Sequence, residues 1–350
     1  MYKMKKGILS LDIYPAFLIL LMIILLSSSV VSHFASHGFF PFNVAEAHSP
    51  TIPVGISPFG IKYNPSNDNI YVANPGSSTV SVISGSTNSV IDTILVGRGP
   101  AWLEYVPSNN QIYVTNDGSN DVYVINSLTN DVVKAIPVGR APESIAYDPV
   151  NNFVYVGNSG DNTVSVINAA TDVVVSTIPL LASNVTYFLP FIAYSPISDA
   201  LYVSRFYAGD VSVINAVTNA EVNNIIVNVG ATPCHRPSGI AYNPDNHYLY
   251  VVCSDPDGVF IISTITNSII DRITAGIGTV ATGIAYNPTN HNMYVTNFGS
   301  NSVSVIDSTT NSVIANIPTG NRPYGITYDS SNQHIYVTNI DSNTVTMIHP

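Results

Sequence analysis

Four short runs of apolar and β-branched residues recur along the chain after residue 50, and turn-forming residues bound each run. One copy spans residues 137–178, and its four runs are ESIAY, FVYVGN, TVSVINA and VVVSTI. The segments between them, DPVNN, SGDN and AATD, carry Asn, Asp, Gly and Pro, which adopt turn conformations readily. Short turns between β-branched runs are typical of antiparallel hairpins, so one copy predicts a four-stranded antiparallel sheet.

This pattern occurs seven times, and a Tyr-Val dipeptide marks the second run of each copy. The dipeptides are spaced by 42, 42, 47, 48, 44 and 42 residues. Seven four-stranded units of this length predict an all-β fold, a seven-bladed β-propeller. A solenoid is the competing repeat architecture, but the runs are apolar on both faces and no polar capping repeat is seen. The dipeptides begin at Tyr71, Tyr113, Tyr155, Tyr202, Tyr250, Tyr294 and Tyr336.

The last copy has three strand-like runs instead of four. The segment SPTIPVG (49–55) resembles the end of a fourth run and its exit, as in KAIPVG (134–139). We therefore expect residues 46–52 to supply the outer strand of the last blade and to close the ring, which removes exposed sheet edges. The blades are expected at residues 53–94, 95–136, 137–178, 179–227, 228–273, 274–317, and 318–350 with 46–52.

The second runs also carry a recognisable motif. IYVTN (112–116), MYVTN (293–297) and IYVTN (335–339), followed by GSNxVSVI-like runs, resemble the repeat of the YVTN-family β-propellers over about residues 50–350. The resemblance implies a seven-bladed propeller outside the cytoplasm, as in archaeal surface-layer and bacterial extracytoplasmic proteins. It implies no single activity, because similar propellers occur in lactonases, lyases and quinone-dependent dehydrogenases.

The first 47 residues differ from the propeller region, 48–350. Lys3, Lys5 and Lys6 precede the apolar run AFLILLMIILL (16–26), an order typical of a secretory signal. The longer run 13–31 has 19 residues, enough to span a bilayer, so a cleaved signal peptide and an uncleaved membrane anchor both stay open. Either alternative predicts an extracytoplasmic protein, secreted or on the cell surface.

Charge is scarce and mostly negative. Only 9% of the residues are charged, and from residue 48 onward eight Lys and Arg face twenty Asp and Glu, a net charge of −12. Nonspecific nucleic-acid binding needs a cationic surface, so we expect no nucleic-acid partner.

Arginine is concentrated on one predicted face of the propeller, the one that holds the blade connectors and the turns between second and third strands. Arginine binds carboxylates and phosphates in a bidentate manner, so these side chains could form an anion or partner site. They could equally bond to carbonyl groups or Asp of their own fold. The weak site prediction comprises Arg98, Arg140, Arg205, Arg236, Arg322, Trp102, Glu143 and Tyr324.

Blades four and five depart from the repeat. Cys234 lies in an elongated connector and Cys253 replaces the Asn of YVTN, so both fall on the same face of one blade; a disulfide is expected, with two free thiols as the alternative. In blade four, Asn184 begins an Asn-Val-Thr sequon and is either a glycosylation site or part of a partner-docking loop.

Catalytic signatures are not evident in the sequence. The propeller histidines are His235, His247, His291, His334 and His349. His247, His291 and His334 are expected in solvated turns between first and second strands, on the opposite face from His235, one per blade and without clustering. Only Glu104 and Glu143 with His235 could be nominated as acid–base residues, and we predict neither a metal nor another cofactor.

The sequence favours an exported, non-enzymatic interaction module, for example one associated with a surface layer, whose partner is a cell-envelope protein or glycan. The alternatives are an extracytoplasmic enzyme of the lactonase or lyase type and a glycan- or small-ligand-binding module.

Overall fold

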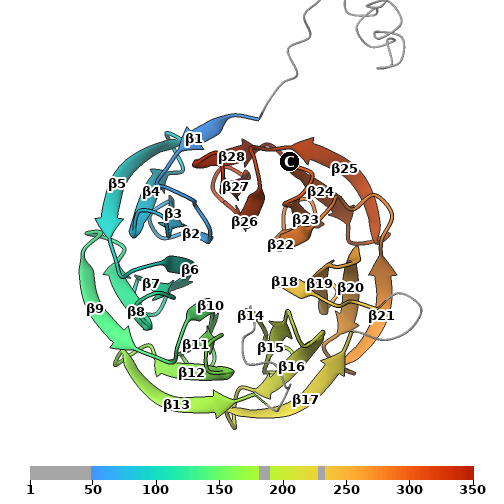
Figure 1. Cartoon of the computed structure of the whole chain (residues 1–350), viewed down its shortest axis with the longest axis horizontal. Coiled ribbons are helices and arrows are strands. Elements are labelled where there is room, and N and C mark those ends of the chain that lie inside the picture. The colour runs from blue at the N-terminus through green and yellow to red at the C-terminus, as the bar shows by residue number, and fades with distance from the viewer. Residues whose placement is uncertain (1–48, 181–189, 228–232) are drawn as a thin grey trace, which may run out of the picture. The chain divides into compact units, whose positions relative to one another are not determined.

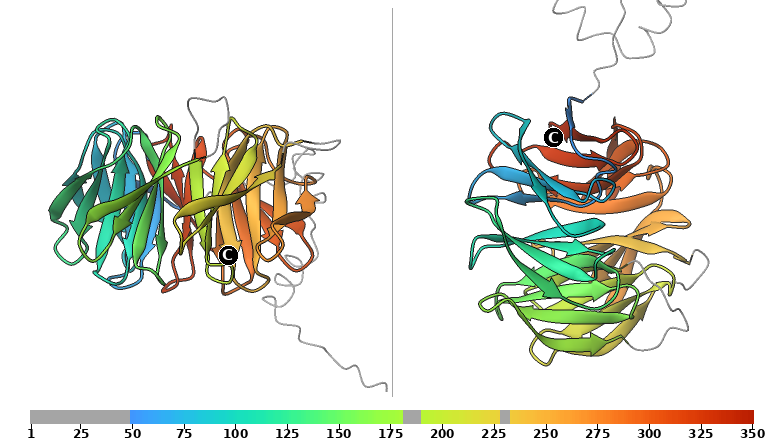
Figure 2. Two further views of the ribbon diagram at one scale, coloured as in Figure 1. Left: turned by 90° about the horizontal axis from the view of Figure 1, so that it is seen from below. Right: turned by 60° about the vertical axis from the view of Figure 1, so that its left-hand side comes forward.

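The β-branched runs of each repeat form strands that pair with one another in sequence order. The computed structural model describes residues 49–180, 190–227 and 233–350. Within these residues the strands form seven four-stranded antiparallel sheets arranged around a central axis (Figure 1). Seen edge-on, the seven sheets stand side by side as a flat ring (Figure 2). The predicted seven-bladed β-propeller is confirmed.

The second strands of the sheets carry the largest share of buried residues. Strands β3 and β27, for example, are buried along almost their whole length. The innermost strands are β2 (Ile61–Asn64), β6 (Pro100–Val106), β10 (Pro142–Asp148), β14 (Pro190–Ser195), β18 (Pro237–Asn243), β22 (Ala281–Asn287) and β26 (Pro323–Tyr328). The second strands are β3 (Asn69–Asn74), β7 (Gln111–Asn116), β11 (Phe153–Asn158), β15 (Ala200–Arg205), β19 (Tyr248–Ser254), β23 (Asn292–Asn297) and β27 (Ile335–Asn339).

The outer strand of each blade lies on the circumference. In six blades it contains a bulge, and the bulged residue is a β-branched aliphatic side chain that is 46–59% exposed. The third strands are β4 (Thr79–Ser84), β8 (Asp121–Asn126), β12 (Thr163–Asn168), β16 (Asp210–Asn215), β20 (Asp257–Ser263), β24 (Ser302–Asp307) and β28 (Thr344–Ile348). The outer strands are β5 (Ser89–Leu95), β9 (Val132–Pro137), β13 (Val173–Pro179), β17 (Ala220–Ile226), β21 (Ser268–Ile273), β25 (Ser312–Pro318) and β1 (Thr51–Pro53).

The seventh sheet combines strands that lie far apart in the sequence. β1 pairs antiparallel with β28, so that Ile52 faces Val345 and Thr51 faces Thr346. The strand covers Thr51–Pro53, which is shorter than the predicted 46–52, and residues up to 48 lie outside the described part of the chain. In the other six blades a turn joins the third and fourth strands, whereas in the seventh blade these two strands have no connecting turn.

The blades pack face to face, which explains why their strands are apolar on both sides. Each hydrophobic cluster joins residues of neighbouring sheets; one cluster, for example, contains Tyr71 and Val80 of the first blade with Leu103 and Ile112 of the second. The tyrosine of every Tyr-Val dipeptide is at most 1% exposed. Burying so much aromatic and aliphatic surface between sheets is the main favourable contribution to the free energy of folding.

The turns use the predicted residue types. Asn, Asp and a few other residues occupy the left-handed backbone region at regular positions in the turns, as at Asp68, Ser78 and Asn88 of the first blade. Asn and Asp tolerate this region better than most residues, because their side chains bond to nearby backbone groups.

Within the described ranges, no helix has the length and apolarity needed to span a bilayer. The predicted signal or anchor at 13–31 lies outside them.

Candidate functional site

The connector arginines contact their own blade. Arg98 donates to the carbonyl oxygen of Gly118, and Arg140 forms a 2.6 Å ion pair with Asp161. The pair lowers the pKa of Asp161, through the hydrogen bonds that Arg140 donates to its carboxylate.

The two remaining connector arginines follow the same pattern. Arg322 lies 3.3 Å from Asp341, and Arg236 lies 3.9 Å from Asp255. All four guanidinium groups thus reach the turn between the second and third strands of their own blade. This arrangement favours the structural alternative for the connector arginines, since each charge already has a carbonyl or carboxylate partner.

Arg205 does not belong to an exposed site, and this part of the prediction is wrong. Its side chain is 1% exposed and forms a bidentate pair with Asp210, with both N–O distances at 2.6 Å. An arginine in the Asn position of YVTN points into the blade, because that position is buried.

The Asn position itself is structural. Asn158, for example, donates from Nδ2 to the hydroxyls of Thr163 and Ser165 on the neighbouring strand. The connector glycine Gly139 packs against the same side chain: a Cβ atom there would lie 2.6 Å from Asn158 Cγ. The glycine of the blade connector and the asparagine of the YVTN motif therefore pack directly against each other.

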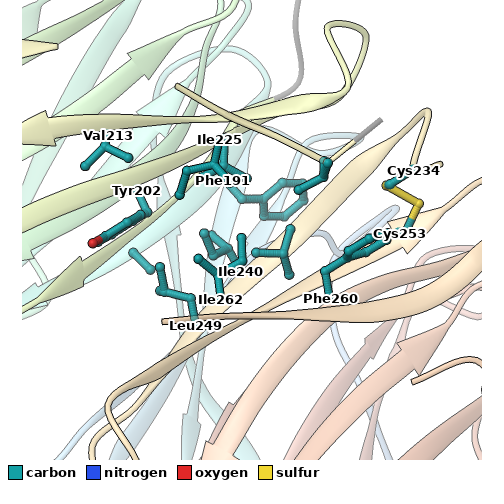
Figure 3. Packing of buried hydrophobic residues seen from close by; sticks show 14 of the residues in the cluster. Phe191, Tyr202, Val213, Ile225, Cys234, Ile240, Leu249, Cys253, Phe260 and Ile262 are labelled. Carbon is teal, nitrogen blue, oxygen red and sulfur yellow. A yellow bond between two sulfur atoms is a disulfide. The ribbon is translucent and has the colours of Figure 1, made fainter. Parts of the chain in front are cut away.

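Cys234 and Cys253 are joined in a disulfide, with their Cα atoms 5.8 Å apart (Figure 3). Both residues are fully buried beside the cluster that contains Phe191 and Ile240. Asn184 lies outside the described residues, so its predicted glycosylation stays a prediction.

Four aromatic side chains meet near the axis of the propeller. Phe59 stacks on Tyr324 with ring centroids 4.1 Å apart, and Trp102 contacts Phe59 and Phe191 edge-on at 6.0 and 5.2 Å. Burial raises the pKa of Tyr324, and the negative charge of the buried Glu143 raises it further. Trp102, Tyr324 and Glu143 thus lie close to one another near the axis of the propeller. They do not share an exposed surface with the connector arginines.

A cavity of about 430 Å³ lies along the axis between the innermost strands. Trp102 and Phe191 of the aromatic cluster line one end of it, and Tyr63, Tyr286 and Tyr328 line the other. The ion pair between Lys62 and Glu104, at 2.6 Å, projects into this cavity from the first two blades. The equivalent residues of blades three to six are Ala146, Ala193, Ala241 and Ala285. The ion pair therefore makes one side of the channel polar.

Each innermost strand carries a tyrosine as its last or second-to-last residue, and these seven residues surround one end of the channel. In six blades the hydroxyl group bonds to the side chain five residues later, for example from Tyr147 to Asn152 at 2.9 Å. The tyrosines are Tyr63, Tyr105, Tyr147, Tyr194, Tyr242, Tyr286 and Tyr328.

One of these tyrosines belongs to a charged cluster. Tyr286 donates to the carboxylate of Asp245, and His291 Nδ1 lies 2.5 Å from the same oxygen. These hydrogen bonds, first from Tyr286 and then from His291, lower the pKa of Asp245. Because Tyr286 lines the cavity and His291 is 61% exposed, the cluster connects the channel with solvent.

The nominated acid–base residues do not assemble into a metal-binding group. Glu104 is paired with Lys62, while His235 is exposed in its connector. Among the residues that the structure describes, no three His, Cys, Asp or Glu side chains are placed to hold a metal ion together.

Neither the channel ion pair nor the tyrosine end of the channel was predicted from the sequence. Two signals were available. Lys62 is one of only two lysines after residue 48, and a Tyr followed five residues later by Asn, Asp or His recurs in six blades.

Comparison with solved structures shows the fold. Hydrazine synthase of Kuenenia stuttgartiensis aligns with a TM-score of 0.74 at 20% identity, covering 89% of this chain and 99% of that chain. A streptogramin B lyase aligns at 0.72 and 16% identity, covering 86% and 96%. A catalytically inactive virginiamycin B lyase from Staphylococcus aureus, solved with quinupristin, aligns at 0.72 and 16% identity, covering 85% and 97%.

No protein-family model and no curated protein matches the sequence. At these identities the structural likeness establishes a seven-bladed β-propeller and leaves the activity open.

Proposed function

We propose that the protein is an exported binding propeller that holds a small, hydroxyl-rich ligand, such as a cell-envelope sugar, in its central channel. The observation that carries this proposal is the cavity of about 430 Å³ with the Lys62–Glu104 pair on its wall. Its volume falls within the range of ordinary ligand pockets, about 300–1,000 Å³.

The lining of the channel suits a ligand with many hydroxyl groups. Each innermost strand is the edge of its sheet, so its outward backbone N–H and C=O groups have no neighbouring strand. The hydroxyl oxygens of Tyr63, Tyr286 and Tyr328 add further acceptors. Lys62 is the more exposed member of the ion pair, 35% against 16% for Glu104, so a carboxylate on the ligand would meet Lys62 first.

Export is supported by two independent features. The N-terminal lysines and apolar run have the order of a secretory signal, and the Cys234–Cys253 disulfide suits an oxidising compartment. The YVTN-like motifs support membership of the family of surface propellers, and with it a role in a surface layer.

The test is a repeat-consistent variant. K62A/E104A gives the first two blades the alanine that blades three to six carry, so it should fold normally. Glucose, galactose, glucuronate and galacturonate are added in excess, and the melting temperature is recorded. We expect a uronate to raise the melting temperature of the wild-type protein, since it binds only the folded state, and to leave the variant unchanged. If no sugar changes the wild-type value, the channel proposal is wrong.

An enzyme of the lyase type is the second candidate. The Tyr286–Asp245–His291 cluster at the tyrosine end of the channel could supply a general base or acid, and the lyase neighbours share the fold. An active enzyme would lose turnover in H291A while it keeps sugar binding. Turnover that is undiminished in H291A, or absent from the wild-type protein with lactones and streptogramins, would argue against this candidate.

A further inference from the structure

The seventh blade differs from the others at the place where its two outer strands would be joined. In six blades the tyrosine of the Tyr-Val dipeptide bonds to the turn that joins the third and fourth strands of the next blade, as from Tyr155 to Asn219 at 2.8 Å. Tyr294 faces the seventh blade, which has no such turn. A pocket of about 200 Å³ lies here, with Asn290 and Asn332 in its wall.

Two histidines line this pocket, and they form a cross-strand pair. Ile335 pairs with Ile348, so His334 and His349 are the next facing positions of the hairpin β27–β28. Their rings are nearly perpendicular, with centroids 3.9 Å apart. Facing residues of antiparallel strands have Cβ atoms about 4.5–5.5 Å apart, a spacing that lets two imidazoles reach one ion.

The pair is a departure from the repeat. At the same two positions the first blade has Asn69 and Ser84, and the sixth has Asn292 and Asp307. Histidine in both positions occurs only in the blade where the pocket is present.

The state of His334 also points to a ligand. Its Nδ1 is buried and has no hydrogen-bond partner among the described residues, an arrangement that is unfavourable for a polar atom. His349 is exposed and can adjust its ring. Imidazole is a preferred ligand of zinc and copper, and the net charge of −11 favours a bound cation.

We propose that His334 and His349 bind one divalent transition-metal ion, Zn²⁺ or Cu²⁺, at the junction between the seventh blade and its neighbour. The amide oxygen of Gln333, which lines the same pocket, and water would complete the coordination. This proposal is independent of the sugar site in the channel, because the two sites share no residue.

The experiment compares the full chain with H334N/H349S, both treated with EDTA and purified without a histidine tag. The variant carries the residue pair of the first blade, so it should fold, and it keeps the other six histidines of the chain. Titration calorimetry with Zn²⁺ should show one more equivalent bound by the wild-type protein than by the variant. H291A removes a histidine of the neighbouring blade and should bind zinc like the wild type.

Two further readouts identify the ligands. Copper bound to the wild-type protein should give an electron paramagnetic resonance spectrum with coupling to two imidazole nitrogens, which the variant loses. Zinc should also raise the melting temperature of the wild type more than that of the variant. The proposal is overturned if wild type and variant bind equal amounts of zinc, or if bound copper shows the same nitrogen coupling in both.

Discussion

Five blades end their second strand with asparagine, whereas blade four has arginine and blade five has cysteine there. In the five blades the amide donates to side chains of the neighbouring strand, as Asn297 does to Ser302 and Ser304. In blade four Arg205 pairs with Asp210, which occupies the position of Ser302.

Blade five lacks the hydrogen-bond partners that an asparagine at this position would need. Gly258 faces Cys253, and Phe260 stands where five of the other six blades carry Ser or Thr, so the hydroxyl partners of an asparagine are missing. The disulfide to Cys234 attaches the connector to the strand end instead. The comparison teaches that the contact between connector and strand end is present in the six blades whose connectors reach the described residues, and that in blade five its chemistry changes together with its partners.

The largest effect is expected in blade four. R205A leaves the Asp210 carboxylate, 8% exposed, without its cation, and breaking a buried pair in this way costs about 3–5 kcal/mol. Chemical denaturation should show this loss in the free energy of unfolding.

The matched control is R205N/D210T, which gives blade four the asparagine and threonine of blade three. Ser212 already stands where blade three has Ser165, and its hydroxyl has no partner among the described residues. We expect the double variant to recover most of the lost stability. A double variant as unstable as R205A would show that the charge pair is not interchangeable with the amide contact.

Breaking the disulfide of blade five comes next. C234A/C253A opens a loop with a sequence separation of 19 residues, which the chain-entropy estimate values at about 3 kcal/mol. Unfolding under non-reducing conditions measures the difference, and reducing agent should lower the wild-type stability by a similar amount. Two free thiols in the unfolded, unreduced wild-type protein would contradict the bridge.

A smaller loss is expected from the asparagine contact itself. N158A removes two buried hydrogen bonds and leaves the hydroxyl groups of Thr163 and Ser165 without this donor, so we expect about 1–3 kcal/mol. The control is N223A, an exposed asparagine of the outer strand of blade four, which should change the free energy of unfolding by less than about 0.5 kcal/mol. If the two substitutions lower the free energy of unfolding equally, the Asn position has no special structural role.

The smallest effect is expected on the exposed connector. R140A breaks a surface pair with Asp161 that is worth less than about 1 kcal/mol. Because Arg140 holds the pKa of Asp161 below its unfolded value, the pair stabilises the protein above that value and loses its effect as the pH falls through the folded pKa. The melting temperatures of the wild type and R140A should therefore differ at neutral pH and become equal in acid. A difference that is independent of pH would assign the effect to packing.

The repeat pattern predicted the blades because each strand and turn is encoded locally, within about ten residues. The burial of Arg205 could not be predicted in the same way, since it depends on an aspartate across the hairpin. The Lys62–Glu104 pair joins two blades, so it requires knowing which side chains of neighbouring blades face the channel. The His334–His349 pair was missed because the two residues are separated by two strands and the turn between them, yet face each other across the hairpin. Repetition reveals the shared scaffold, whereas the individual contacts come from departures that meet only in three dimensions.

The bulges of the outer strands have a consequence for the protein at high concentration. Neighbouring copies would approach one another with their circumferences, where each blade exposes an unpaired strand edge. A bulge interrupts the regular row of backbone donors and acceptors and increases the local twist. Its branched side chain, exposed at Ile91 or Val222, stands at the point where another strand would have to dock. The six bulged edges should therefore resist adding foreign strands, which keeps a dense population of propellers from fusing into fibres.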